Sequence, residues 1–146
     1  MNEYLESIIQ RDPAARNRLN IIINYPGVKA VAFYKLSHTL WNFNLYLLAR
    51  MVSQFARFIT GVEIHPAAKI GKNLFLDHAN SIVIGESSII GDNCTIYHGV
   101  TLGGLSPSEN SQDQVGSKRH PTIEDNVIIG CQATILGPIT IGQCSR

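Results

Sequence analysis

The sequence has no long uninterrupted hydrophobic run, little net charge and no pattern of paired cysteines. Its 146 residues carry a formal net charge of +1, and Arg50, Gln54 and Arg57 interrupt the most apolar window, 41–60. No membrane span is therefore predicted. Domains that bind nucleic acid usually carry a basic excess, so nucleic acid is not expected as the main partner. The hydrophobic share of 45% excludes wholesale disorder.

The cysteines Cys94, Cys131 and Cys144 are an odd set without a CxxC pair. An odd number is a poor disulfide framework, and the missing pair argues against a structural zinc site. The first residues show no secretory signal. We therefore expect three reduced thiols in a cytoplasmic protein.

Residues 1–61 are predicted to form a small α-helical N-terminal region. Apolar residues recur at spacings of three and four between 28 and 40, and again between 45 and 58. This is the periodicity of an amphipathic helix. A shorter helix is expected over 3–10. Pro26 marks the start of the first long helix, and Gly61 marks the end of the region.

From residue 62 onward the period of the sequence changes to six. Neither a helix nor a half-buried strand has this period, whereas a parallel β-helix does, because each hexad forms one side of a coil. The predicted fold class is therefore mainly β. A glycine often follows the aliphatic residue, and we expect it at a tight corner with positive φ. The aliphatic positions are Ile64, Ile70, Leu76, Ile84, Ile90, Ile96, Leu102, Ile123, Ile129, Ile135 and Ile141.

Two breaks interrupt the repeat. Two residues are inserted near Asp77 and His78, and the segment 103–121 is much longer than one hexad and rich in Ser, Pro and Gly. Its composition predicts an exposed excursion loop within the β-helix region 62–146. Loops on a rigid scaffold commonly carry function, so the breaks are where we expect the site.

His78 is the candidate general base. Glu63 lies roughly one coil below it, where a carboxylate could accept one imidazole N–H and leave the other nitrogen free as a base. The alternative is a surface salt bridge. Next to His120, at the end of the long loop, the basic pair Lys118 and Arg119 could hold a carboxylate or could form a solvated loop end.

Several segments together resemble the serine O-acetyltransferase family of hexapeptide-repeat acyltransferases. The similarity runs from about Arg11 to Gly142, and the motifs follow one another in the family's order. The segments that carry it are Arg11-Asp12-Pro13-Ala14, Val62-Glu63-Ile64-His65-Pro66-Ala67-Ala68-Lys69-Ile70-Gly71, Leu76-Asp77-His78-Ala79, Gly85-Glu86, Gly99-Val100-Thr101-Leu102-Gly103-Gly104 and Lys118-Arg119-His120-Pro121.

The resemblance implies a left-handed parallel β-helix that forms a homotrimer with active sites between neighbouring subunits. It also implies transfer of acetyl from the co-substrate acetyl-CoA to the hydroxyl of L-serine, giving O-acetyl-L-serine for cysteine biosynthesis. L-cysteine is the implied inhibitor, and no metal is implied. Because a serine hydroxyl is protonated at neutral pH, its attack on a thioester requires a base.

Carried over by position, the resemblance assigns a catalytic pair, two substrate-binding pairs and a cofactor-binding pair. The catalytic pair is the general base His78 and the orienting carboxylate Glu63. The other pairs are Asp12 and Asp77 for the serine amino group, Arg119 and His120 for its carboxylate, and Gly104 and Cys131 for CoA.

Three departures from the family pattern modify these expectations. The chain begins close to Asp12, whereas larger members have a longer helical region that pairs two trimers, so a lone trimer is expected. The loop before His120 is longer than usual. The sequence stops at Arg146 inside a coil, as in a fragment or a shortened form, which predicts an open strand edge and weaker use of acetyl-CoA. The family's tail that docks into cysteine synthase is absent, which argues against that partner.

Three alternatives stay open at this point. The first is a hexapeptide acetyltransferase for a sugar or xenobiotic, although Asp12 with Arg119 and His120 favours an amino acid. The second is a zinc enzyme of the γ-carbonic-anhydrase kind, which needs closely spaced histidines, whereas His78, His98 and His120 lie far apart in sequence. The third is a truncated, non-catalytic scaffold.

Overall fold

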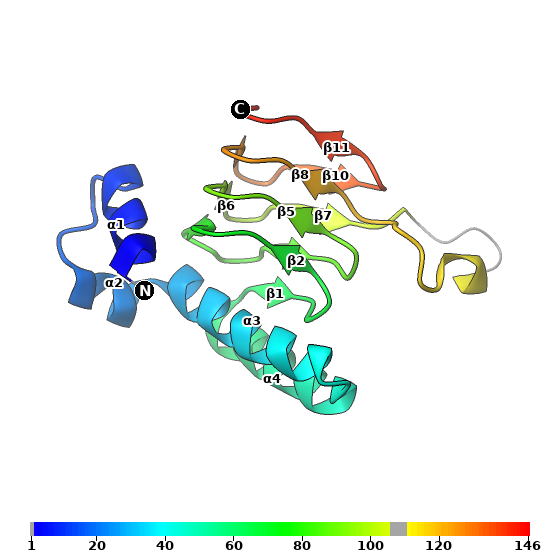
Figure 1. The fold of residues 1–146 in the computed structure, drawn as a ribbon. Helices are drawn as coiled ribbons and strands as arrows, with labels where there is room; N and C mark the ends of the chain where they lie inside the picture. Colours follow the sequence, from blue (N-terminus) through cyan, green and yellow to red (C-terminus); the bar gives the residue numbers. More distant parts are fainter. Residues whose placement is uncertain (1, 106–110) are drawn as a thin grey trace.

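A computed structural model describes residues 2–105 and 111–146. Within these ranges the chain forms four helices followed by short strands (Figure 1). The sequence predicts three of the helices. The additional helix, α2 (Arg18–Asn24), starts where the side chain of Asn17 accepts a hydrogen bond from the Asn20 backbone N–H at 2.8 Å. None of the helices in the described part of the chain has the length and hydropathy needed to cross a bilayer. The helices are α1 (Asn2–Arg11), α2 (Arg18–Asn24), α3 (Pro26–Asn42) and α4 (Tyr46–Thr60).

From residue 63 the chain winds into a three-sided parallel β-helix, in which one full turn is called a coil (Figure 1). Each side is one parallel sheet, because equivalent strands of successive coils lie above one another. The sheet orders are β1-β4-β7-β10, β11-β8-β5-β2 and β3-β6-β9. The strands are β1 (Glu63–Ile64), β2 (Lys69–Ile70), β3 (Phe75–Asp77), β4 (Val83–Ile84), β5 (Ile89–Ile90), β6 (Thr95–Tyr97), β7 (Thr101–Gly103), β8 (Thr122–Ile123), β9 (Ile128–Ile129), β10 (Thr134–Leu136) and β11 (Thr140–Ile141).

The strand registers locate both breaks in the repeat. Glu63 pairs with Val83 and Val83 pairs with Thr101, so the lower coil is two residues longer than the next one. Ile89 pairs with Thr122, so the chain leaves the stack after β7 and returns in register at β8. The excursion contains the 3-10 helix Ser111–Gln114. Positions 106–110 of the predicted loop lie outside the described residues.

The aliphatic residue of each hexad supplies the core. Ile64, Ile84 and Leu102 stack in one column on the first sheet, and each is at most 4% exposed. Burial of a side chain of this size contributes roughly 1.5–3 kcal/mol. Small residues four places further along fill the space between the columns, and Ala68 and Cys94 are fully buried there. The six-residue period is therefore the period of the core itself.

The repeat glycines do not adopt the positive φ that the sequence analysis assigns to them. A Cβ at Gly71 would lie 2.3 Å from Oδ1 of Asp92, and a Cβ at Gly91 would lie 2.3 Å from Oδ1 of Asp125. These glycines are needed for close approach between coils rather than for a special backbone conformation. The left-handed corners are instead occupied by residues that tolerate αL, among them Asn73, Asn93 and Asn126, with φ of 57–59°.

The helices α3 and α4 pack against each other at the lower end of the coil stack (Figure 1). At the start of α3, Gly27 lies against β3, where a Cβ would be 2.2 Å from the carbonyl oxygen of Leu76. Only glycine permits this distance. The close contact brings residues 24–26 beside the end of β3, where the predicted site begins.

Candidate active site

The first cluster of predicted site residues lies where β3 gives way to β4. We call Asp12, Tyr25, Asp77 and His78 the His78 corner. His78 and the following Ala79 have φ of 55° and 60°, which is the left-handed region. Each such non-glycine residue costs about 1–3 kcal/mol. The two inserted residues thus bend the backbone outward and leave the His78 side chain exposed.

A cavity of about 320 Å³ opens at this corner. Its size matches the lower end of small-molecule sites in proteins. It brings together three of the predicted site residues, Asp12, Asp77 and His78, from two distant parts of the sequence. The complete lining is Asp12, Ala14, Asn24, Tyr25, Pro26, Leu76, Asp77 and His78.

Arg11 fixes the end of α1 onto the coil and thereby places Asp12. Its Nη2 donates to the carbonyl of Asn73 at 2.6 Å, and its Nη1 donates to the carbonyl of Cys94 at 3.0 Å. The guanidinium also lies over the ring of Phe75, 5.4 Å from the centroid. Burial lowers the pKa of Arg11 from its ordinary value, but the group remains a cation.

Asp12 is held by two donors. The hydroxyl of Tyr25 donates to Oδ2 at 2.5 Å, and the backbone N–H of Ala14 donates to Oδ1 at 2.8 Å. Desolvation, together with the hydrogen bond to Asp12, raises the pKa of Tyr25 to about 12. The hydroxyl therefore remains a donor at physiological pH. Because Asp77 also lines the cavity, this space carries two carboxylates, which suits a cationic group such as an ammonium.

His98 lies one coil above His78, and the two rings meet edge to face. Their ring centroids are 5.7 Å apart at an interplanar angle of 84°, and Nδ1 of His98 is buried without a partner among the described residues. Glu63 pairs with Nη1 of Arg57 at 3.2 Å. Within residues 2–105 and 111–146 no hydrogen bond joins Glu63 to His78, so the orienting role of Glu63 stays a prediction.

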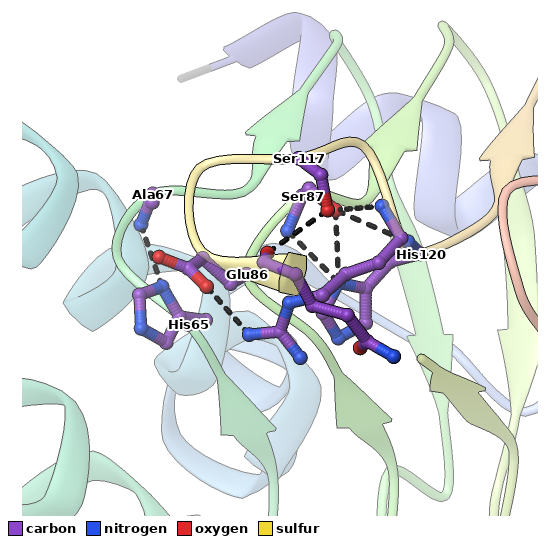
Figure 2. Close-up of polar contacts among 8 residues, drawn as sticks. His65, Ala67, Glu86, Ser87, Ser117 and His120 are labelled. Carbon is purple, nitrogen blue, oxygen red and sulfur yellow. Dashed lines mark hydrogen bonds and ion pairs between the residues drawn. The ribbon is translucent and has the colours of Figure 1, made fainter. Parts of the chain in front are cut away.

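The second cluster lies where β7 gives way, through the excursion, to β8. We call Gly85, Glu86, Ser87, Arg119 and His120 the His120 corner, and Figure 2 shows Glu86, Ser87 and His120 of this group. His120 is only 6% exposed. Its ring lies against Gly85, where a Cβ would be 2.0 Å from Cδ2. Nδ1 of His120 lies 2.9 Å from Oγ of Ser87 and accepts the Ser87 backbone N–H at 3.2 Å.

Arg119 is already paired in this structure. Its Nη2 donates to Oε2 of Glu86 at 2.6 Å (Figure 2). This hydrogen bond holds the pKa of the Glu86 carboxyl below its ordinary value. Lys118 donates from Nζ to the carbonyl of His120 and so ties the end of the loop to the corner. The basic pair is therefore part of an ordered network rather than a solvated loop end.

The two corners occupy different edges of the three-sided coil, so one chain does not bring all the predicted site residues together. Gly104 lies at the His120 corner, where a Cβ would be 3.4 Å from Nη1 of Arg119. Cys131 is exposed in the turn after β9. The registers β3–β6 and β6–β9 place it two coils above His78 at the same edge. No three His, Cys, Asp or Glu side chains are grouped to hold a metal ion in the described part of the chain.

Three residues that shape these corners are not among the predicted site residues. Tyr25 stands in the motif that starts α3, and no local pattern marks it as a partner of Asp12. Ser87 and Glu86 contact residues 33 positions away across the excursion. Only the register after the loop could reveal those contacts.

Curated relatives match almost the whole chain. The serine acetyltransferase of Helicobacter pylori strain J99 is 50% identical over 142 residues, which are 97% of this chain and 79% of that protein. The serine acetyltransferase of Mycobacterium tuberculosis is 53% identical over 137 residues, which are 94% of this chain and 57% of that protein. No family model matches the chain.

Solved structures match the fold. The Neisseria gonorrhoeae serine acetyltransferase in complex with serine superposes with a TM-score of 0.88 at 38% identity, over 96% of this chain and 55% of that one. A serine acetyltransferase in complex with CoA has a TM-score of 0.86 at 36% identity, over 96% of this chain and 55% of that one. Serine acetyltransferase isoform 3 from Entamoeba histolytica, in complex with cysteine, has a TM-score of 0.87 at 37% identity, over 97% of this chain and 48% of that one. The chain thus spans about half the length of these structures. The predicted fold class, a left-handed parallel β-helix after a small helical region, is confirmed.

Proposed function

Because the chain belongs to the serine acetyltransferase family, we propose that it transfers acetyl from acetyl-CoA to the hydroxyl of L-serine. The serine oxygen forms the new ester bond, the carbon–sulfur bond of the thioester breaks, and the products are O-acetyl-L-serine and CoA. The observation that carries the proposal is the cavity at the His78 corner, where an exposed imidazole and two carboxylates line one small space.

Asp12 and Asp77 are proposed to hold the amino group of serine. Both line the cavity, and an ammonium between two carboxylates forms charge-assisted hydrogen bonds, which are stronger than neutral ones. Tyr25 supports this role because its hydroxyl fixes the Asp12 carboxylate in place.

His78 is proposed as the general base. A neutral imidazole at the cavity wall can take the proton from the serine hydroxyl as the oxygen attacks the thioester carbonyl. The resulting imidazolium can return this proton to the departing sulfur. Because a thiolate is a good leaving group, the reaction demands more from the base than from an acid. The exposed position of His78 allows both transfers.

A homotrimer is proposed to complete the site. Arg119 and His120, proposed for the serine carboxylate, lie at a different edge from His78, so a neighbouring copy must supply them if both pairs act on one substrate. Three-fold packing of parallel coils brings an edge of one copy to a different edge of the next. The exposed apolar side chains at the edge of the His120 corner support such packing: Leu105, Leu136 and Ile139.

The CoA arm is proposed to run along the edge that carries His78, His98 and Cys131. The strand registers align these positions in successive coils, so a chain laid along the edge delivers its thioester to His78. Gly104 would contact CoA from the other corner. L-cysteine has the same amino and carboxylate groups as L-serine, with a thiol in place of the hydroxyl. It is therefore proposed to bind to the same residues as an inhibitor.

We further propose a cytoplasmic location. All three cysteines are unpaired, and Cys131 and Cys144 are exposed. Exposed free thiols persist best in a reducing compartment.

A thiol-release assay with L-serine and acetyl-CoA tests the function. His78→Ala should reduce turnover at least ~100-fold, the lower end for general-base catalysis, with an unchanged circular dichroism spectrum. His38→Gln is the matched control, since His38 lies on α3 and contacts the Pro66 carbonyl; it should retain turnover. Activity of His78→Ala within a few-fold of wild type would contradict the assignment. CoA release with a sugar but not with L-serine would favour a different acceptor.

A further inference from the structure

The Ser87 side chain is fully occupied by hydrogen bonds around His120. Its Oγ accepts the backbone N–H of Arg119 at 2.9 Å and the backbone N–H of His120 at 3.1 Å (Figure 2). A serine hydroxyl has two lone pairs and one proton. Because both lone pairs are taken, the hydroxyl proton must be donated, and the remaining neighbour is Nδ1 of His120 at 2.9 Å.

The backbone of Ser87 leads to the same result independently. Its N–H also points at Nδ1 of His120, at 3.2 Å, and a backbone N–H can only donate. Nδ1 therefore receives two donors and must carry a lone pair. In a neutral imidazole the proton then resides on Nε2.

The other side of the ring is kept open by glycine. A Cβ at Gly85 would lie 2.2 Å from Nε2, and a Cβ at Gly104 would lie 3.5 Å from it. Nε2 has no hydrogen bond to any described residue, although the ring as a whole is buried. An N–H at this position is therefore available to an acceptor from outside the chain.

We propose that Ser87 is a positioning residue that holds His120 as the neutral tautomer protonated on Nε2, so that His120 presents a permanent N–H donor to the substrate. The identity of the acceptor, a carboxylate oxygen of the amino acid, rests on the proposed function. The tautomer does not. Without the Ser87 hydroxyl only the backbone N–H, at 3.2 Å, would still donate to Nδ1, so the preference for a proton on Nε2 would weaken and the ring would be held less firmly toward the carboxylate.

The charged groups around the ring favour the same neutral state. Burial comes first, and the Arg119 guanidinium next, in lowering the pKa of His120. Glu86 acts in the opposite direction and Lys118 adds to the lowering. His65, at the same edge and one coil below Gly85, also interacts with His120. Protonation of Nδ1 would in addition place an N–H against the donating backbone N–H of Ser87.

The tautomer is measured directly by long-range proton–nitrogen NMR of the imidazole rings in the intact chain, with the His120 signals assigned from the His120→Gln spectrum. We expect a bare Nδ1 and a protonated Nε2 at neutral pH, because Nδ1 receives two donors. A protonated Nδ1 at neutral pH would overturn the proposal whether or not the chain acetylates serine. Loss of the proposed function alone would leave this spectrum unchanged.

Kinetics test the consequence. Ser87→Ala should raise KM for L-serine roughly 3- to 10-fold, the equivalent of one neutral hydrogen bond, with a smaller effect on kcat. Its KM should also depend more strongly on pH, because Nδ1 loses the hydroxyl donor that competes with a proton. Ser87→Thr keeps the hydroxyl and should restore the wild-type KM.

Ser88 supplies the matched control. It is the neighbouring serine, 1% exposed, and its hydroxyl is unpartnered among the described residues. Ser88→Ala should leave KM and its pH profile unchanged. A Ser87→Ala enzyme with the KM, pH profile and ring spectrum of the wild type would overturn the proposal. If Ser87→Ala does not fold, the wild-type spectrum and Ser87→Thr still decide it.

Discussion

The two histidines at the two corners are held in opposite ways. His78 is exposed, lies in a strained bend, and its ring meets that of His98 edge to face. His120 is buried, and its Nδ1 receives both the backbone and the side chain of Ser87. A base must gain and lose a proton in every cycle, which requires access and few fixed bonds. A binding group works best in one protonation state, which requires the reverse.

A side chain that displaces the ring of His120 should have the largest effect on binding of L-serine. In Gly85→Ala the new Cβ would fall 2.0–2.2 Å from the His120 ring, so the imidazole must leave its site. Overpacking costs about 1–3 kcal/mol, and we expect a rise in KM for L-serine of up to ~100-fold. Steady-state kinetics measure this. Gly130→Ala is the control, because nothing lies within 4 Å of its added Cβ. Equal kinetics for both variants would contradict the role of the His120 corner.

Removing the negative charge of Asp12 at the His78 corner should have the next largest effect on the KM for L-serine. Asp12→Asn keeps the size and the acceptor for Tyr25 but loses the charge that attracts an ammonium. Charge-assisted hydrogen bonds contribute about 1.5–3 kcal/mol, so KM for L-serine should rise roughly 10- to 100-fold. KM for acetyl-CoA is the internal reference and should stay unchanged. An unaltered KM for L-serine would remove Asp12 from the binding site.

Removing a hydrogen bond to the Asp12 carboxylate, while keeping its charge, should have a smaller effect on the KM for L-serine. Tyr25→Phe deletes the donor to Oδ2 of Asp12, 2.5 Å away, and keeps the ring. The loss of one hydrogen bond of about 0.5–1.5 kcal/mol predicts a rise in KM for L-serine of roughly 3- to 10-fold. Tyr46→Phe is the control, since its hydroxyl donates to exposed Asn44. A Tyr25→Phe enzyme indistinguishable from wild type would show that Asp12 needs no support from Tyr25.

Acid should weaken the folded chain modestly through a histidine beside the His120 corner. Desolvation, then Arg50, lower the pKa of His65 to about 4, so the folded state resists its protonation. The unfolded chain binds the extra proton between about pH 6.5 and 4, and stability should therefore fall as the pH is lowered through this window. Urea unfolding at several pH values measures the loss. His65→Gln should flatten the dependence more than His78→Gln does, and equal slopes would contradict this origin.

The sequence predicts the fold because the signal is repeated in every coil. Ile84 and Leu102 each mark one side of a coil, so an error at one position does not change the period. The prediction that the repeat glycines have positive φ is nevertheless wrong. Positive φ falls on residues such as Asn93, whereas Gly91 serves close approach to the Asp125 side chain of the next coil. A local pattern identifies which residue is small but not which neighbour requires it.

The candidate site is predictable where the repeat breaks and unpredictable where contacts depend on register. The insertion at Asp77 and His78 is visible in the sequence, and both line the cavity. The contact of Ser87 with His120 is not visible, because it forms only after the excursion returns to the stack at β8. Whether the eight residues chosen from the sequence act as assigned stays a prediction for the variants above.

The return of the excursion in register has a consequence for how such a chain can change. Within the stack, a coil packs mainly against the coils directly above and below it. The stability of the stack is therefore close to a sum of contacts between neighbouring coils. Within the stack of coils, a loop that leaves between β7 and β8 and rejoins at the pairing of Ile89 with Thr122 leaves the contacts between successive coils intact. Its closure entropy grows only with the logarithm of length, about 0.6 kcal/mol for each doubling. The scaffold and the loop can therefore be altered separately, which makes this segment a natural exchange point for grafting a different acceptor preference onto an unchanged stack.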